Sequence, residues 1–194
     1  MKGTIIKCLQ DLVTDKYGQE EWKAAIEDAG LRRNTIFMPI SDIDDESVLA
    51  IITAVCTRQK LSLAEISNIF GDYWVNVYSQ VMYKQFFQRH STARQFILAM
   101  DDVHVNMTRT MANARPPRFD YEWKDDCTLH MTYKSHRGLI DLMVGLIKGV
   151  GRYYGESLGV TLVSRNIVQI VFQPENQEPK SAATESTKVE ETTV

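Results

Sequence analysis

The stretch Cys127–Arg137, CTLHMTYKSHR, alternates in a way that predicts a β-strand. Successive side chains on a strand point to opposite faces, so the even-numbered positions form one polar face that belongs in water. The odd-numbered face begins with apolar residues and ends in Tyr133, Ser135 and Arg137. Because burying an arginine without a partner is costly, this face is expected to meet carboxylates or a phosphate. A second interpretation stays open, in which the strand simply emerges into solvent near its end.

The flanking sequence predicts an α+β fold, in which a helical N-terminal part packs on a C-terminal part with a small antiparallel sheet and one long helix. Helices are expected over residues 4–17, 19–29, 45–58 and 63–70. Ser41 or Asp45 is the expected cap of the third, and Ser62 is the expected cap of the fourth. Gly71 is expected to end the fourth helix, and an aromatic segment, 72–87, follows it. A further helix is expected to run from Ser91 or Thr92 to the Pro116-Pro117 pair. The remaining expected elements are a strand Phe119–Trp123, a turn 124–126, a helix 138–154, and a hairpin of Val160–Val163 and Ile167–Phe172.

Composition indicates one globular domain without a nucleic-acid or membrane partner. The 194 residues are 44% hydrophobic and 24% charged, and the net charge of −3 gives no electrostatic footprint for nucleic acid. No apolar run is long enough to cross a bilayer, and the start lacks a signal-peptide pattern. The cysteines, at positions 8, 56 and 127, are odd in number and widely spaced, which favours a reducing cytoplasm. Residues 1–173 are the expected domain, and the polar residues 174–194 are expected to be a disordered tail or linker.

A histidine interrupts the apolar stripe of the helix that starts near Thr92. His104 lies among Phe96, Ile97, Met100, Val103, Met107 and Met111. Taken alone, such a histidine is more often a satisfied core residue than a ligand. A neutral imidazole on a buried, methionine-rich wall is also what a haem pocket needs, and the two haem carboxylates would meet the fork of Tyr133, Ser135 and Arg137. Haem would thus explain both the histidine on the apolar stripe and the polar end of the strand's inner face, each of which is ambiguous alone.

Four motifs occur together in this chain. They are YxSxR at 133–137, MDDVH at Met100–His104, the Pro116-Pro117 pair, and FGDYW at Phe70–Trp74. In this order they resemble the haem nitric oxide/oxygen-binding (H-NOX) family, whose haem domain is also found in soluble guanylate cyclase. The resemblance extends from the initial MKG to about Phe172.

The resemblance implies a role for several residues toward haem b. It implies that His104 ligates the iron and that Tyr133, Ser135 and Arg137 bind the propionates. It further implies that Pro117 presses on the porphyrin and bends it, and that Ile5 packs against the ring.

One departure from the family pattern bears on which gas is bound. Oxygen-binding members carry a distal tyrosine five residues past the motif's arginine, where this chain has Leu142, followed by Met143. Those members also hold the tyrosine with a polar residue, where this chain has Trp74. An apolar wall of Leu9, Leu142, Met143 and Trp74 lacks the hydrogen-bond donor that favours dioxygen, so it favours NO, and weakly CO. Whether the hydroxyl of Tyr78 reaches this wall is left open.

The resemblance therefore implies a gas sensor rather than an enzyme. NO is expected to weaken the bond between the iron and His104, so that the haem relaxes and the two parts of the protein move. No output domain is recognisable in the sequence, so the signal is expected to reach a histidine kinase, a cyclic-di-GMP enzyme or a chemotaxis receptor.

Four other classes are weighed against it. They are an oxygen-binding member of the same family, a haem peroxidase or oxygenase, a non-haem module for apolar carboxylates, and a thiol-based redox sensor. A peroxidase needs a distal acid or base. The remaining histidines do not suit that role, because His130 and His136 lie on the polar face of the strand and His90 lies in a loop-like segment.

Overall fold

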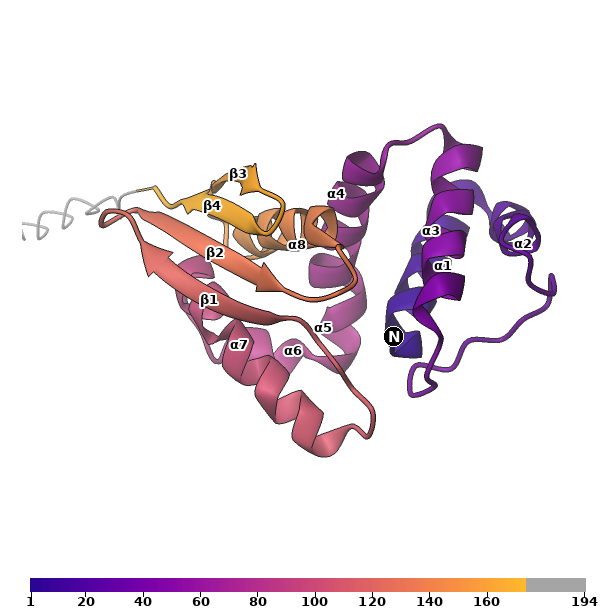
Figure 1. Cartoon of the computed structure of the whole chain (residues 1–194), viewed down its shortest axis with the longest axis horizontal. Coiled ribbons are helices and arrows are strands. Elements are labelled where there is room, and N and C mark those ends of the chain that lie inside the picture. The colour runs from indigo at the N-terminus through magenta and orange to yellow at the C-terminus, as the bar shows by residue number, and fades with distance from the viewer. Residues whose placement is uncertain (174–194) are drawn as a thin grey trace, which may run out of the picture.

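The computed structural model describes residues 1–173 and divides them between a helical part and a part built on a β-sheet (Figure 1). The helical part holds α1 (Gly3–Tyr17), α2 (Gln19–Asp28) and α3 (Asp45–Gln59). The chain continues through α4 (Leu63–Tyr73), a π-helical turn (Trp74–Tyr78), α5 (Ser79–Met82), α6 (Lys84–Gln88) and α7 (Ala93–Thr110). It ends in β1 (Arg118–Trp123), β2 (Thr128–Lys134), α8 (Ile140–Tyr153), β3 (Gly159–Ser164) and β4 (Ile167–Val171). The expected α+β class is confirmed, whereas the expected tail, 174–194, lies outside the described residues.

The four strands form one antiparallel sheet in the order β1-β2-β4-β3, which includes the expected hairpin of β3 and β4. The prediction that the second strand runs to Arg137 is wrong, because β2 ends at Lys134, which pairs with Arg118. Pro117 immediately precedes Arg118 and has no N–H to extend the ladder. The chain then turns, and Gly138 takes a positive φ of 64°. Strand alternation therefore does not orient Ser135 and Arg137.

Two helix boundaries differ from the expected ones. The cap of α3 is Asp44, whose carboxylate accepts the Ser47 N–H at 2.7 Å, rather than Ser41 or Asp45. Ser62 caps α4 as expected, in a capping box with Glu65. Gly71 does not interrupt α4.

The helix passes through Gly71 because a glycine is needed there for close packing rather than for a turn. A Cβ on Gly71 would lie 2.1 Å from the Gly145 carbonyl carbon, and a Cβ on Gly145 would lie 1.9 Å from the Ser67 carbonyl oxygen. Helices α4 and α8 therefore cross with their backbones in contact. At this crossing Gly145 lies against Ser67, and Gly149 lies against Gly71, so the end of α4 packs against the middle of α8.

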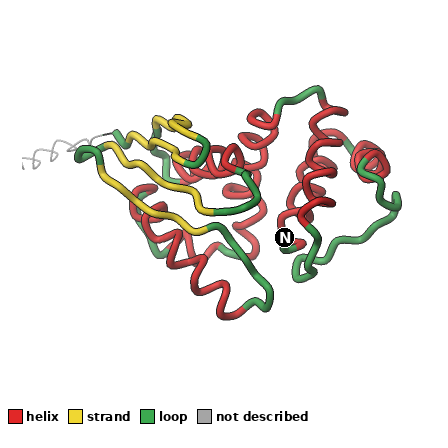
Figure 2. The backbone as a smooth tube through the Cα atoms, in the orientation of Figure 1, coloured by secondary structure: helices red, strands yellow, loops and turns green. Residues whose placement is uncertain are grey.

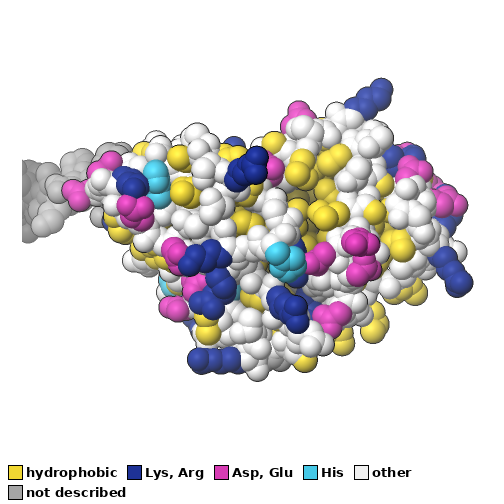
Figure 3. All heavy atoms as spheres, in the orientation of Figure 1, with side chains coloured by type: hydrophobic (Ala, Val, Ile, Leu, Met, Phe, Trp, Pro, Cys, Tyr) yellow, Lys and Arg dark blue, Asp and Glu magenta, His cyan; other side chains and the backbone are white. Residues whose placement is uncertain are grey.

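The apolar core has two centres, one in each part. The sheet, α7 and α8 surround one cluster, and α1, α2, α3 and the first turns of α4 surround the other. Trp74 packs against both clusters, and Leu142 packs against the helical one. The tube view places the N-terminus between the two parts (Figure 2), and hydrophobic side chains gather at the same seam in the space-filling view (Figure 3).

In the part of the chain that the structure describes, no single helix meets the length and hydropathy expected of a membrane span. One bent pair, Asp45–Gln59 with Leu63–Met82, meets them by length and composition together.

Candidate functional site

A cavity of about 280 Å³ lies between the two core clusters. Its walls come from α1, α4, the π-helical turn, α7, the segment 113–117, β1, β2 and α8, and they are mostly apolar. The few polar groups among its lining residues come from Lys2, Thr4, Asn113, Arg115, Arg137, Tyr133, Tyr83 and His104, together with the N-terminal amine of Met1 and the indole N–H of Trp74. A concave, largely apolar site with a small number of polar groups is typical of a cofactor pocket.

Helix α7 presents His104 on one wall of this cavity, as the apolar stripe predicts. The Nδ1 atom lies 2.8 Å from the Pro117 carbonyl oxygen, so Nδ1 carries the proton and donates it. Burial holds the pKa of His104 below its ordinary value, although the Pro117 hydrogen bond and Asp101 act in the opposite direction. The imidazole is therefore neutral near pH 7, with Nε2 free to act as a metal ligand. Pro117 lines the same wall.

The wall contributed by α1, α4 and α8 is built from packed apolar and aromatic side chains. Ile5, Trp74, Leu142 and Met143 all line the cavity. The indole of Trp74 stacks on Phe70, Tyr78 and Tyr83, with ring centroids 5.9, 5.4 and 6.2 Å apart. The sequence interpretation placed Trp74 in the pocket wall, and it did not identify Tyr83 as a lining residue.

Leu9 lies behind this wall rather than in it. It lines a second, smaller cavity of about 30 Å³, which shares Ile5, Phe70 and Leu142 with the main one. Leu9 therefore supports the side chains that face the main cavity without being one of them.

The position of Tyr78 answers the question that the sequence left open. Its hydroxyl lies 3.2 Å from the Thr4 hydroxyl, and its side chain is not among the residues that line the main cavity. Burial raises the pKa of Tyr78, so it remains a phenol. Tyr83, rather than Tyr78, is the phenol beside Trp74 in the cavity.

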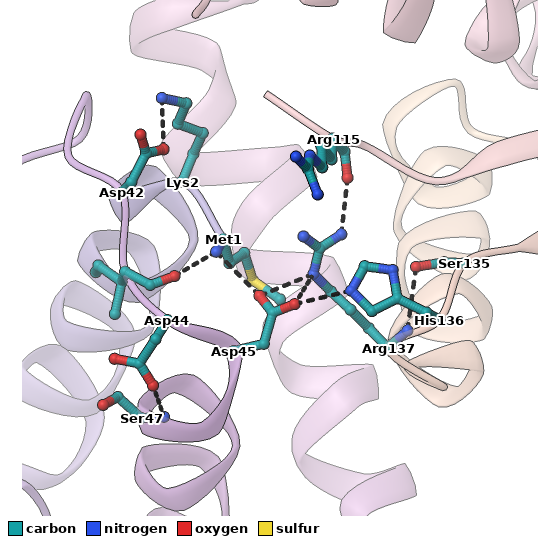
Figure 4. Close-up of polar contacts among 11 residues, drawn as sticks. Met1, Lys2, Asp42, Asp44, Asp45, Ser47, Arg115, Ser135, His136 and Arg137 are labelled. Atoms are coloured by element: carbon teal, nitrogen blue, oxygen red, sulfur yellow. Dashed lines mark hydrogen bonds and ion pairs between the residues drawn. The ribbon is translucent and has the colours of Figure 1, made fainter. Parts of the chain in front are cut away.

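Arg137 lies at the mouth of the cavity and already has an anionic partner there (Figure 4). Its Nε lies 3.0 Å from the Asp45 carboxylate, and one Nη donates to the Arg115 carbonyl oxygen at 2.7 Å. The same carboxylate accepts from the N-terminal amine of Met1 at 3.0 Å and from His136 at 3.1 Å. Burial alone would raise the pKa of Asp45, but these hydrogen bonds hold it well below its usual range.

The other two members of the predicted fork differ in position. Tyr133 is buried, lines the cavity and packs on Phe119 with ring centroids 6.3 Å apart. Ser135 is not a lining residue, and its hydroxyl accepts the Arg137 N–H at 3.3 Å. Sequence reasoning did not connect Asp45 or Arg115 with Arg137, because an acidic helix start and a lone arginine carry no signal that the fold will bring them to Arg137.

The cavity suits a flat apolar group that carries its own metal and two acids. Within residues 1–173 no cluster of three or more His, Cys, Asp or Glu side chains has the geometry to hold a metal ion. The single imidazole of His104 is therefore matched to a metal that brings its other ligands with it, as haem iron does. The cations of Lys2, Arg115 and Arg137 at the mouth suit carboxylates.

Comparison with known proteins gives the same description. A family model described as Haem-NO-binding matches residues 2–162. A Cs H-NOX mutant with 4-cyano-L-phenylalanine at site 5 is similar with a TM-score of 0.80 and 25% identity, over 92% of this chain and 100% of that one. An oxygen-binding H-NOX domain related to soluble guanylate cyclases, solved as its oxygen complex, is similar with a TM-score of 0.76 and 26% identity, over 93% and 99%.

Curated relatives are longer proteins. Soluble guanylate cyclase gcy-34 of Caenorhabditis elegans is 23% identical over 156 residues, which cover 78% of this chain and 23% of that protein. The related gcy-32 is 22% identical over 173 residues, or 87% of this chain. The chain spans about a quarter of the length of the curated relatives it matches.

Proposed function

The chain belongs to the haem-NO-binding family, and on that premise we propose that residues 1–173 sense NO at ferrous haem b, bind CO weakly and exclude O₂. Members of this family are haem-binding sensor domains, so the chain is a gas-sensor domain and not an enzyme. Its choice of gas, its haem type and its signalling partner are the proposed part.

The observation that carries the proposal is His104, a neutral imidazole held by Pro117 in an apolar cavity. We assign the iron to His104 Nε2 and the haem propionates to Tyr133, Ser135 and Arg137. Pro117 and Ile5, which line the cavity, are assigned to contact the porphyrin. For Arg137 this assignment requires the guanidinium either to bind a propionate in addition to the Asp45 carboxylate or to exchange Asp45 for the propionate.

Haem held in this way would supply an iron that binds a gas, and His104 would be its ligand from the protein. Leu142, Met143 and Trp74 line one wall of the cavity and would keep water out. A bound dioxygen is stabilised by a hydrogen-bond donor, and losing a charge-assisted bond of this kind costs about 1.5–3 kcal/mol. At 1.4 kcal/mol per tenfold, that cost corresponds to about 10- to 150-fold in affinity. NO binds ferrous iron strongly without such help, so this wall favours NO.

Signalling would begin when NO causes His104 to leave the iron. His104 is on α7 in the sheet part, whereas Ile5 is on α1 in the helical part, so haem bound in this cavity would contact both parts. Release of His104 removes one of these links and biases the arrangement of the two parts, as a two-state sensor requires. A histidine kinase, a cyclic-di-GMP enzyme or a chemotaxis receptor is the proposed recipient, in a cytoplasmic setting.

Titration of the purified protein with hemin tests the proposal. We expect one haem per chain, a Soret band and, after reduction, distinct shifts on adding NO or CO. Arg137→Ala is expected to release haem several-fold faster than the wild type, whereas Arg33→Ala, an ion-paired arginine of the helical part, serves as the matched control.

A protein that gains no Soret band is not a haem sensor. The non-haem alternative would gain support if a long-chain carboxylate bound and hemin did not, because that module needs Arg137 but not His104.

A further inference from the structure

A row of polar contacts joins α7 to the start of β1. Tyr121 donates its hydroxyl proton to the Ile97 carbonyl oxygen at 2.9 Å, in the second turn of the helix. One turn further on, the Asp101 carboxylate binds the first residues of β1. Another turn on, His104 Nδ1 donates to Pro117. The proposed iron ligand is thus the last member of a row that fastens this helix to this strand.

Asp101 makes the strongest of these contacts. Its Oδ1 accepts from Arg118 Nε at 2.7 Å and from the Phe119 N–H at 2.8 Å, and its Oδ2 accepts from an Arg118 Nη. The Asp101 side chain is 20% exposed, whereas that of Arg118 is 52% exposed. The Arg118 hydrogen bonds lower the pKa of Asp101 to about 2, so the carboxylate stays charged at any physiological pH. Such a bidentate pair fixes geometry as well as charge.

Asp101 also binds the two residues that directly follow Pro117, the hydrogen-bond acceptor of His104. The Pro117 carbonyl shares its planar peptide unit with the Arg118 nitrogen. Pro117 has no N–H of its own, so no ladder hydrogen bond can hold it from that side. Asp101 holds the Arg118 side chain together with the next amide, Phe119 N–H, and thereby fixes the position of the Arg118 Cα, to which the Pro117–Arg118 peptide unit is attached.

We propose that the Asp101–Arg118 pair is a positioning element that holds the Pro117 carbonyl where it fixes the ring orientation and tautomer of His104. The inference rests on the proposed function, because it concerns His104 as an iron ligand. Partners of this kind orient metal-ligating histidines and make the imidazole a better donor. The pair therefore sets how firmly His104 holds iron and how readily it leaves when NO binds.

Two variants remove the pair from either side. Asp101→Asn weakens both contacts of the carboxylate, and Arg118→Gln removes the exposed partner with little risk to folding. Arg118→Lys retains the charge and should keep part of the effect. Glu21→Gln is the matched control, because Glu21 binds Arg58 with two oxygens in the helical part, away from His104.

The first measurement is the iron–histidine stretching frequency of the reduced, haem-loaded protein. We expect Asp101→Asn and Arg118→Gln to lower this frequency and to raise the fraction of NO-bound protein in which His104 has left the iron. The double variant should lower the stretching frequency no further than Asp101→Asn alone, because both residues act through one ion pair. Unchanged frequencies, or shifts equal to those of Glu21→Gln, overturn the inference.

The second measurement needs no haem. Ring ¹⁵N chemical shifts of the haem-free protein report the His104 tautomer, and we expect the Nδ1–H form in the wild type and a mixture with the Nε2–H form in Asp101→Asn. Identical tautomer populations overturn the inference. Because this comparison does not use the cofactor, a failure of haem binding would reject the proposed function and leave this result to stand by itself.

Discussion

The two walls of the cavity are held in place by different forces. On the α7 side, His104 is positioned by a hydrogen bond to Pro117 and by the ion pair of Asp101 with Arg118. On the α8 side, Leu142 and Met143 are positioned by packing in the two apolar clusters and by the close crossing of α4 and α8. Hydrogen bonds fix direction and protonation, whereas apolar packing is non-directional. The first wall suits an iron ligand. The second suits selection between small gases, because the Leu142 and Met143 side chains offer no hydrogen-bond donor to a bound gas.

Removing the imidazole should give the largest effect, because the hydrogen-bonded wall then loses its only proposed ligand. We expect His104→Gly to weaken haem retention by at least about 100-fold, and free imidazole to restore it. Haem transfer to an apo-globin acceptor measures the rate. His90→Gly, in a loop outside the cavity, should behave like the wild type. Retention of haem by His104→Gly without imidazole would show that another residue holds the iron.

A phenol at position 142 should add a hydrogen-bond donor to the α8 side of the cavity, where Leu142 has none. Leu142→Tyr is expected to raise O₂ affinity by about tenfold or more, since a hydrogen bond to a charged acceptor contributes about 1.5–3 kcal/mol. Leu142→Phe adds the ring without the hydroxyl and is the matched control. Equal O₂ affinity in the two variants would mean that this position does not decide the choice of gas.

Acid should loosen the mouth, where Asp45 ties α3 to Arg137. The pKa of Asp45 lies below its ordinary 3.8, so the stabilisation is fully present above about pH 4 and is lost as the pH falls below that value. We expect Asp45→Asn to be less stable than the wild type by about 1–2 kcal/mol at pH 7 and to lose less stability between pH 4 and pH 2. Thermal melts at each pH provide the comparison.

Glu46→Gln, an exposed carboxylate at the same helix start, is the control for that series. Parallel curves for Asp45→Asn and the wild type would show that Asp45 contributes nothing specific to stability.

The smallest effect is expected at the phenol beside Trp74. Tyr83 lines the cavity, and if the packed wall selects gases by its apolar character, Tyr83→Phe should change the CO dissociation rate by less than about twofold. Tyr78→Phe, whose hydroxyl is engaged with Thr4, is the matched control. A tenfold faster dissociation in Tyr83→Phe alone would make that phenol a ligand-stabilising donor and would revise the contrast between the walls.

The sequence predicted the parts of the fold that depend on local patterns. The Ser62 cap and the β3–β4 hairpin follow from side-chain spacing and capping chemistry, and the structure confirms them. The His104 stripe also lines the cavity, except for Val103, which is not a lining residue. The end of β2 was not predictable in this way, because it depends on the proline that precedes the neighbouring strand. Gly71 was interpreted as a break because the helix that packs against it is 74 residues away in the sequence.

In the candidate site, too, local motifs predicted some residues, whereas contacts between distant parts of the chain were not predictable. His104, Pro117, Tyr133 and Trp74 meet in one cavity, as the motifs predict, although their roles toward haem stay predictions. The inner face of the strand was expected to place Arg137 opposite an anion. The structure provides Asp45 instead, through a contact between residues 92 positions apart that no local pattern encodes.

The most direct test of the central claim is the absorption spectrum of the reduced, haem-loaded protein, recorded first in air and then with NO. We predict that air produces no oxygen complex and that NO shifts the Soret band at once. A stable oxygen complex in the wild-type protein would contradict the claim that its apolar wall selects NO over O₂.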